Sequence, residues 1–397
     1  MRDAVIVDVV RTASGKGKPG GALSGTHPVD LLAGVIKALV DRTGIDPALV
    51  QDAICGCVSQ VGEQALNIGR SAVLAAGLPE HVPATTIDRQ CGSSQQAVQF
   101  AAHGVMAGFY DVVIAAGVES MSRVPMFSSL AGKDPNRAAL AARYPDGLVN
   151  QGISAEILAA RWKLDREALD EYSARSHRLA AATAASGRFD TEIVPVQVTG
   201  PDGTTRAHTL DETVRASTTA AGLAGLNPSF VDEDLGRRFP EIDWRITPGN
   251  SSSLADGASA VLIMSADTAE RLNLRPRARF HSFAVTGSDP LLMLDGVVAA
   301  TEQVLARGGL TVNQIDAYEV NEAFAPVPLL WREAFDADPE KLNPRGGAIA
   351  LGHPLGASGT RLLATLVNQL EATGGRYGLQ TMCEGAGMAN ATIVERL

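Results

Sequence analysis

The chain has 397 residues, 45% of them hydrophobic and 20% charged, which predicts a folded globular protein with two or three domain-sized units. Its net charge of -10, without any lysine or arginine run, argues against a nucleic-acid partner, and no apolar run is long enough to predict a membrane span. Four scattered cysteines and an N-terminus that turns polar by Arg11 predict neither a disulfide framework nor a targeting signal, and favour the cytoplasm.

Apolar, β-rich runs alternate with alanine-rich stretches along most of the chain, which is typical of an α/β protein with mostly buried strands. In chain order, the pattern predicts strands at residues 5–10, 111–118, 258–264, 279–286, 316–320, 379–383 and 388–394, and helices at 31–40 and 91–106. From about residue 121 to 247 the character changes, and one long, charge-studded helix is predicted at 154–186. We expect this segment to lie over the core as an excursion from the sheet.

Cys91 is the first candidate for chemistry, because it stands between a predicted strand and a helical stretch in segment 85–94 (TTIDRQCGSS). A helix N-terminus favours the thiolate, the reactive form of cysteine, and can lower its pKa to about 3.5–7.5. Small neighbours would also let a substrate carbonyl approach the sulfur. From this local context alone, a structural half-buried cysteine fits equally well.

His353 and Cys383 both lie in loops of small residues, in segments 346–359 (GGAIALGHPLGASG) and 382–388 (MCEGAGM). A lone histidine is more often structural, but such loops cost stability unless the backbone must bend sharply or a ligand must come close. Asn321 adds a polar side chain directly after an apolar strand. We therefore expect one site that combines two thiols with an imidazole. The openings of the two helices, at 91–94 and 356–359, also suggest two similar halves.

Together these motifs resemble the signatures of the thiolases, the CoA-dependent enzymes that make or break 3-ketoacyl-CoA. The resemblance spans nearly the whole chain, from Arg11-Thr12 to the loop of Cys383. It implies an α/β thiolase fold, with two similar βαβαβαββ halves in a layered core and an inserted loop domain. The halves would be residues 1–268, which carry the loop domain at about 121–248, and residues 269–397.

The resemblance also implies a role for each motif. Cys91 would attack the substrate carbonyl and carry the acyl group, His353 would activate that thiol, and Cys383 would move the α-proton. One oxyanion hole would use His353 with a water held on Asn321, and the other would use the backbone amides of Cys91 and Gly385. The implied activity is acyl transfer: thiolytic cleavage of 3-ketoacyl-CoA to acetyl-CoA and a shortened acyl-CoA, or the reverse Claisen condensation.

CoA and acetyl-CoA are implied as substrates, with no tightly bound cofactor and no metal. The positions that match CoA-binding residues of the family are Gln151, Arg215 and Ser252. A turn hydroxyl and a solvated charge are the simpler explanations of Ser252 and Arg215. Family members are usually homo-oligomers, so a homodimer or homotetramer is expected, and residues 122–145 are long enough to contribute to tetramer contacts.

The chain departs from the usual thiolase pattern at several positions. These are Asp88, Ser94, Pro344-Arg345, Glu384 and Ala386, together with segment 150–152 (NQG), which lacks the methionine-glycine pair of short-chain biosynthetic members. The departures spare the catalytic atoms and leave the acyl-chain length open. They favour a degradative enzyme, acting in fatty acid β-oxidation or on bulky acyl groups such as steroid side chains.

Other interpretations fit the sequence less well. A ketoacyl synthase would place a second histidine or an asparagine at Cys383, and a non-catalytic thiolase-like carrier of acyl-CoA or sterol would lack a catalytic residue. Segment 15–20 (GKGKPG) spells a dinucleotide-binding fingerprint, but no helix follows it directly. Cys55 and Cys57 could suggest a metal, but no second ligand pair is near in sequence, so packed thiols are favoured.

Overall fold

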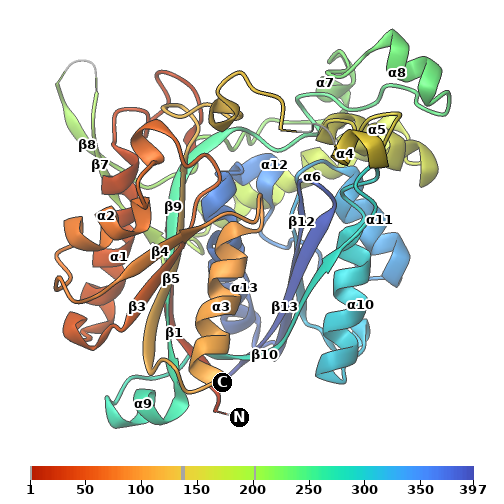
Figure 1. Cartoon of the computed structure of the whole chain (residues 1–397). Helices are drawn as coiled ribbons and strands as arrows, with labels where there is room; N and C mark the ends of the chain where they lie inside the picture. Colours follow the sequence, from red (N-terminus) through yellow and green to blue (C-terminus); the bar gives the residue numbers. More distant parts are fainter. Residues whose placement is uncertain (1, 136–138, 201–202) are drawn as a thin grey trace.

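The computed structural model describes residues 2–135, 139–200 and 203–397, and Figure 1 shows their arrangement. The strands are β1 (Ala4–Thr12), β2 (Gly15–Lys16), β3 (Asp52–Gly56), β4 (Ala84–Ile87), β5 (Val112–Ser120), β6 (Ile193–Val194), β7 (Val196–Thr199), β8 (Thr205–His208), β9 (Ala255–Ser265), β10 (Ala278–Gly287), β11 (Ala317–Val320), β12 (Tyr377–Glu384) and β13 (Met388–Arg396). The α-helices are α1 (Pro28–Thr43), α2 (Ile68–Ala75), α3 (Ser93–Met106), α4 (Ala139–Arg143), α5 (Gln151–Arg161), α6 (Arg166–Ala185), α7 (Ala220–Ala224), α8 (Glu233–Arg238), α9 (Ala266–Arg271), α10 (Gly296–Gly308), α11 (Pro326–Phe335), α12 (Ala348–Leu351) and α13 (Ser358–Thr373). Each predicted strand coincides with an observed one to within a few residues.

The main sheet repeats one pairing pattern on its two sides. Its strand order is β11-β12-β13-β10-β1-β9-β5-β3-β4. On one side β4, β3 and β5 are parallel, and β5, β9 and β1 are antiparallel. On the other side β11 and β12 are parallel, and β12, β13 and β10 are antiparallel. The two sides meet through a short antiparallel contact in which Val5 and Ile6 pair with Arg279 and Ala278. The predicted similarity of the two halves is thus visible in the strand order.

Helices separate and cover the two sides of the sheet. In Figure 1, α3 and α13 lie next to each other in the centre, α1 and α2 cover one side, and α10 and α11 cover the other. Helix α1 shows why its segment folds this way. Leu31, Val35 and Leu39 recur at helical spacing and are buried, His27 caps its first turn, and Gly44 ends it in the left-handed region at φ 66°.

A separate group of short elements lies over the end of the core at which α3 begins (Figure 1). The single helix predicted at 154–186 is wrong, because α5 and α6 divide this segment. Lys163 takes φ 52°, which breaks the helical hydrogen-bond ladder, and the Asp165 side chain accepts from Ala168 N to start the next helix. None of the helices in the described ranges is both long and apolar enough to span a bilayer.

Candidate active site

Cys91 lies in a tight turn between β4 and α3. The turn contains Gln90 in the left-handed region at φ 47°, and Gly92 stands at the cap position directly before α3. The helix therefore begins two residues later than predicted, and the thiol precedes its first turn. The Cys91 residue is only 4% exposed and contacts a small apolar cluster that includes Leu362 and Met382.

Cys383 and Asn321 come from neighbouring parallel strands. Cys383 is on β12 near its end, and Asn321 directly follows β11. The Asn321 amide donates to the Thr381 carbonyl over 3.0 Å, which fixes its backbone beside the cysteine strand. Both residues are buried. Because parallel strands end at the same edge of a sheet, the two side chains reach the same end of the core.

His353 enters from the loop between α12 and α13. Gly352 precedes it at φ 80°, and a Cβ on Gly352 would lie 2.7 Å from the Ala255 Cβ, so this bend needs glycine. The His353 amide donates to the Ser253 carbonyl over 2.9 Å. Farther along the loop, the Gly356 amide donates to the buried carboxylate of Glu119, also over 2.9 Å. The small residues that marked this loop in the sequence therefore allow close backbone packing around the histidine.

The hydrogen bonds of His353 fix the tautomer of its neutral ring. Its Nδ1 lies 2.6 Å from Ser358 Oγ, and that hydroxyl donates its single proton to the Pro354 carbonyl over 2.9 Å. Nδ1 must then carry the proton and donate to Ser358. The Nε2 atom then carries the lone pair, which accepts from Asn321 Nδ2 over 3.4 Å. Burial, aided by the nearby Arg361, lowers the pKa of His353 to about 3. The ring is therefore neutral, with Nε2 available as a base.

Asn321 also carries an unused acceptor. Its Oδ1 is buried and has no hydrogen-bond partner among the described residues, although Nδ2 approaches His353. Buried amide oxygens are normally satisfied, by protein or by an ordered water. This atom is therefore suited to hold the water that was expected between Asn321 and the substrate oxygen.

The thiol of Cys91 differs from the expectation of a lowered pKa. Burial, with repulsion from Glu384, raises the pKa of Cys91 to about 12, against the smaller lowering by hydrogen bonds from the Gln151 side chain and from the Cys91 and Gly385 backbones. The expectation was wrong because the effect of a helix end is about 0.3–1 kcal/mol, whereas full burial can shift a pKa by 3–5 units. Cys91 is thus a protonated thiol that needs a base.

Cys383 is also a protonated thiol. Burial, together with the nearby Cys91 and Glu384, raises its pKa well above the usual range. Because Cys91 contributes to this rise, the two thiols lie near each other. A Cβ on Gly385 would lie 3.0 Å from Gln90 Oε1 and 3.2 Å from Gln151 Nε2, so the backbone of this glycine faces the same space.

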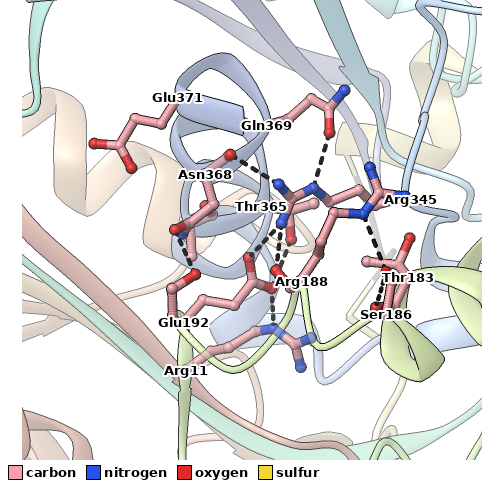
Figure 2. Close-up of polar contacts among 12 residues, drawn as sticks. Arg11, Thr183, Ser186, Arg188, Glu192, Arg345, Thr365, Asn368, Gln369 and Glu371 are labelled. Atoms are coloured by element: carbon pink, nitrogen blue, oxygen red, sulfur yellow. Dashed lines mark hydrogen bonds and ion pairs between the residues drawn. The ribbon is translucent and has the colours of Figure 1, made fainter. Parts of the chain in front are cut away.

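A buried polar network surrounds Arg345, and Figure 2 shows it. Arg345, directly before the paired glycines of the His353 loop, donates to Gln369 Oε1 over 2.9 Å, to the Asn368 carbonyl over 2.8 Å and to the Arg188 carbonyl over 2.7 Å. Arg345 is almost fully buried, and one guanidinium nitrogen lies 3.8 Å from Glu192. The sequence marked Arg345 as a departure from the family pattern, and the structure gives it a supporting position.

Glu192 connects this network to the N-terminal strand. Its carboxylate is fully buried and accepts from Arg11 Nε over 2.6 Å and from the Thr365 hydroxyl over 3.1 Å. Arg11 also pairs with Asp211 over 2.7 Å. The ion pairs thus join β1 to the segment before β9, and the hydrogen bond from Thr365 adds helix α13 to the network.

Two supporting residues were not identified from the sequence. Ser358 forms a hydrogen bond with the His353 ring. Nothing in the sequence indicated this contact except that Ser358 lies five residues after the histidine. Glu322 accepts from Tyr172 over 2.8 Å and from Ser176 over 2.7 Å on α6, and from the Ile349 amide over 3.1 Å on α12. It connects the covering elements to the histidine loop, and its signal was its place beside Asn321.

The three expected CoA-binding residues are spread over the covering segment. Gln151 opens α5, where its side chain contacts the Cys91 thiol. Ser252 is half-buried, and its amide donates to the Ala323 carbonyl over 2.9 Å. Arg215 is exposed, and its amide donates to His177 Nδ1 over 3.2 Å. The structure thus brings Gln151 to the Cys91 thiol, whereas Arg215 lies at the surface.

Metal ligation has no support in the described part of the chain, where no group of three or more histidine, cysteine or acidic side chains could hold an ion. Cys55 and Cys57 are both buried, as packed thiols would be. Burial raises the pKa of Cys55 to about 12.

Comparison with known proteins identifies the family. Residues 4–267 match the family model described as thiolase, N-terminal domain, and residues 274–396 match thiolase, C-terminal domain. The chain is 46% identical to the steroid 3-ketoacyl-CoA thiolase FadA6 of Mycobacterium tuberculosis, covering 100% of this chain and 95% of that protein. It is 42% identical to a 3-ketoacyl-CoA thiolase of Idiomarina loihiensis, with full coverage of both.

A solved structure gives the same result for the fold. The crystal structure of a Bacillus anthracis acetyl-CoA acetyltransferase matches with a TM-score of 0.89 at 34% identity, over 100% of this chain and 99% of that one. The predicted α/β fold with two similar halves is confirmed, and so is the resemblance stated from the motifs. The chain belongs to the thiolase family.

Proposed function

We propose that this protein cleaves 3-ketoacyl-CoA thiolytically in lipid degradation, through an acyl group carried on Cys91. The observation that carries the proposal is the combination of two buried protonated thiols with a neutral imidazole whose Nε2 carries a lone pair. A single thiol would suffice for simple thioester hydrolysis. A second acid–base group is needed when a carbon acid must gain or lose a proton, and the Cys383 thiol can serve as that group.

In the first half-reaction, the Cys91 proton passes to His353 Nε2 while the sulfur attacks the 3-keto carbon. The tetrahedral oxyanion collapses, the bond between C2 and C3 breaks, and the acetyl-CoA enolate leaves. Cys383 gives its proton to C2 of this enolate and becomes a thiolate. The amides of Cys91 and Gly385, or a water on Asn321 with the protonated His353, stabilise the oxygens that become negative.

In the second half-reaction, free CoA enters and the Cys383 thiolate takes its thiol proton. The CoA sulfur attacks the acyl group on Cys91, and the tetrahedral intermediate collapses to acyl-CoA and the Cys91 thiolate. His353 returns its proton to Cys91. Both thiols and the imidazole end in their starting states, so the cycle needs no redox partner and no metal. The same steps in reverse perform Claisen condensation of acetyl-CoA.

The substrate class follows from the relatives together with the departures noted in the sequence. One relative acts on steroid 3-ketoacyl-CoA by its name and another on 3-ketoacyl-CoA. We propose a fatty acyl or steroid side-chain substrate, with CoA as a substrate rather than a bound cofactor. Ser252 and Arg215 are proposed to contact the CoA chain, and Gln151 to contact it next to Cys91.

Assembly into a homodimer or homotetramer is also proposed. Within segment 122–145, of which residues 136–138 lie outside the described residues, Met126, Phe127 and Leu130 are exposed apolar side chains. Exposed apolar groups that gather on one segment are typical of protein contacts.

The test uses the two cysteines separately. Cys91→Ala is expected to abolish acyl-enzyme formation from acetoacetyl-CoA, measured by mass spectrometry of the trapped protein. Cys383→Ser is expected to acquire the acyl group on Cys91 from acetyl-CoA, yet to lose carbon–carbon bond making and breaking. An acyl group trapped on another residue, or undiminished condensation by Cys383→Ser, would contradict the proposal.

A further inference from the structure

Glu384 directly follows Cys383 and has no part in the mechanism above. Its side chain is buried with an exposed fraction of 0%, at the end of β12. Both carboxyl oxygens lack a hydrogen-bond partner among the described residues. A buried carboxyl group in that condition is rare, because buried polar groups are almost always satisfied.

The carboxyl group packs against Gly92, the N-cap of α3, which directly follows Cys91. A Cβ on Gly92 would lie 1.9 Å from Glu384 Oε1 and 2.7 Å from Asn390 Nδ2. Asn390 Nδ2 in turn donates to the Gly92 carbonyl over 3.2 Å. Glu384 therefore occupies the space that a side chain at position 92 would fill, one residue from Cys91.

The groups that face this carboxyl come from three elements. The turn before α3 contributes Asp88, Arg89 and Cys91, its own strand contributes Cys383, and β13 contributes the neutral Asn390. Among the described residues, Arg89 Nε and both Glu384 oxygens are buried without a hydrogen-bond partner, so no hydrogen bond joins these two side chains. An ionised carboxylate in this place would thus have neither a hydrogen bond nor a bonded cation to offset its desolvation.

The electrostatics of the pocket agree with an uncharged side chain. Burial raises the pKa of Glu384 to about 8; the Arg89 charge opposes this rise and the Asp88 charge adds to it. At neutral pH the carboxyl therefore keeps its proton. When it ionises, its charge raises the pKa of the Cys91 thiol.

We propose that Glu384 is a positioning residue for the nucleophile: as an uncharged carboxyl it holds the start of α3, and its ionisation sets an alkaline limit on the reactivity of Cys91. The limit arises because a fixed negative charge beside Cys91 disfavours a second charge on its sulfur. This role rests on the proposed function only in taking Cys91 as the reactive thiol.

The test is alkylation of Cys91 by iodoacetamide between pH 6.5 and 9.5, with the modified peptide quantified by mass spectrometry. Glu384→Gln keeps the shape of the side chain and removes its titration. Below pH 7 its rate should match the wild-type rate within about twofold, and at pH 9.5 it should be about tenfold faster, as for a thiol pKa lower by about one unit. A rate ratio that stays constant across this range overturns the proposal.

Two controls separate the role of Glu384 from general effects. Glu371→Gln changes a partly exposed glutamate on α13, which pairs with Arg277, and should leave the profile of Cys91 unchanged. If Glu384→Gln does not fold, the dependence of the wild-type alkylation rate on pH tests the proposal by itself. The logarithm of that rate should rise less steeply above pH 8 than below it. A constant tenfold rise in rate per pH unit through pH 8 overturns the proposal.

A second measurement does not involve the thiol. The folded pKa of Glu384, about 8, lies above its ordinary value of 4.5, so the folded chain binds a proton that the unfolded chain releases. The stability contribution is present below pH 4.5 and is lost as the pH rises through 8. The thermal midpoint should therefore fall less with rising pH in Glu384→Gln than in the wild type, and equal slopes would count against the role.

Trapping of the acyl group on a residue other than Cys91 would instead refute the proposed function and leave this comparison valid.

Discussion

Ser358→Ala tests the assignment of His353 as the base that activates Cys91. In the wild type, the Ser358 hydroxyl accepts from His353 Nδ1 over 2.6 Å because it donates to the Pro354 carbonyl. Without the Ser358 hydroxyl, the His353 ring must either keep its proton on Nδ1, where the N–H is buried without an acceptor, or move that proton to Nε2. The second choice brings that proton to the Asn321 amide, 3.4 Å away, and removes the lone pair that accepts the Cys91 proton.

The magnitude follows from the cost of either choice. Leaving one buried donor unsatisfied costs about 1–3 kcal/mol, and a loss of about 1.4–2.7 kcal/mol in the transition state is a 10- to 100-fold loss of rate. We expect kcat for thiolysis of acetoacetyl-CoA to fall by about that factor, with KM within about twofold, because Ser358 contacts the base rather than the substrate. Steady-state absorbance assays give both constants, and single-turnover acylation of Cys91 should slow by the same factor.

Ser94→Ala is the matched control. Ser94 is equally buried, and its hydroxyl accepts from the Thr360 amide over 3.1 Å at the start of the same helix α13. Its loss should lower stability by a similar amount without changing the acylation rate. An unchanged kcat in Ser358→Ala, or an equal loss in Ser94→Ala, would refute the tautomer argument.

Two further predictions concern stability. Arg345→Met should lower the free energy of unfolding by about 3–5 kcal/mol in urea denaturation, because it leaves Gln369 Oε1 and the Asn368 carbonyl buried without their donor and removes one of the two cations beside Glu192; a loss below about 1 kcal/mol would contradict this. Burial lowers the pKa of His353 to about 3 and of His177 to about 4, against 6.5 when unfolded. Because the unfolded chain then binds more protons, stability should be full above pH 6.5 and fall towards pH 4, and His177→Gln should flatten that fall.

The sequence was sufficient where the structural signal is local. Cys91 and Cys383 each stand where a strand runs into a turn of small residues, and the structure places Cys91 in the turn after β4 and Cys383 near the end of β12, close to each other. His353 was identified by the glycines around it, and Gly352 at φ 80° shows why that position needs glycine. Steric requirements of this kind depend on residues that are neighbours in the sequence, so they can be predicted without knowing the fold.

The remaining features depend on contacts distant in sequence. Arg345 is satisfied by carbonyls up to 157 residues away, which no local pattern reveals. The break between α5 and α6 was missed because both helices bury one face, so the apolar spacing continues across Lys163. The Ser358 contact required the position of the Pro354 carbonyl, which only the folded loop defines.

The thiol pKa is the most instructive difference, because it changes how catalysis begins. Because the pKa of Cys91 is raised to about 12 and the pKa of His353 is lowered to about 3, neither group is charged before substrate binds. The preformed thiolate that the helix position suggested is therefore absent before substrate binds. Proton transfer to Nε2 must then accompany attack on the carbonyl, when the new oxyanion and its donors stabilise the separated charges. Since oxidation and alkylation require the thiolate, this arrangement also protects Cys91 between turnovers.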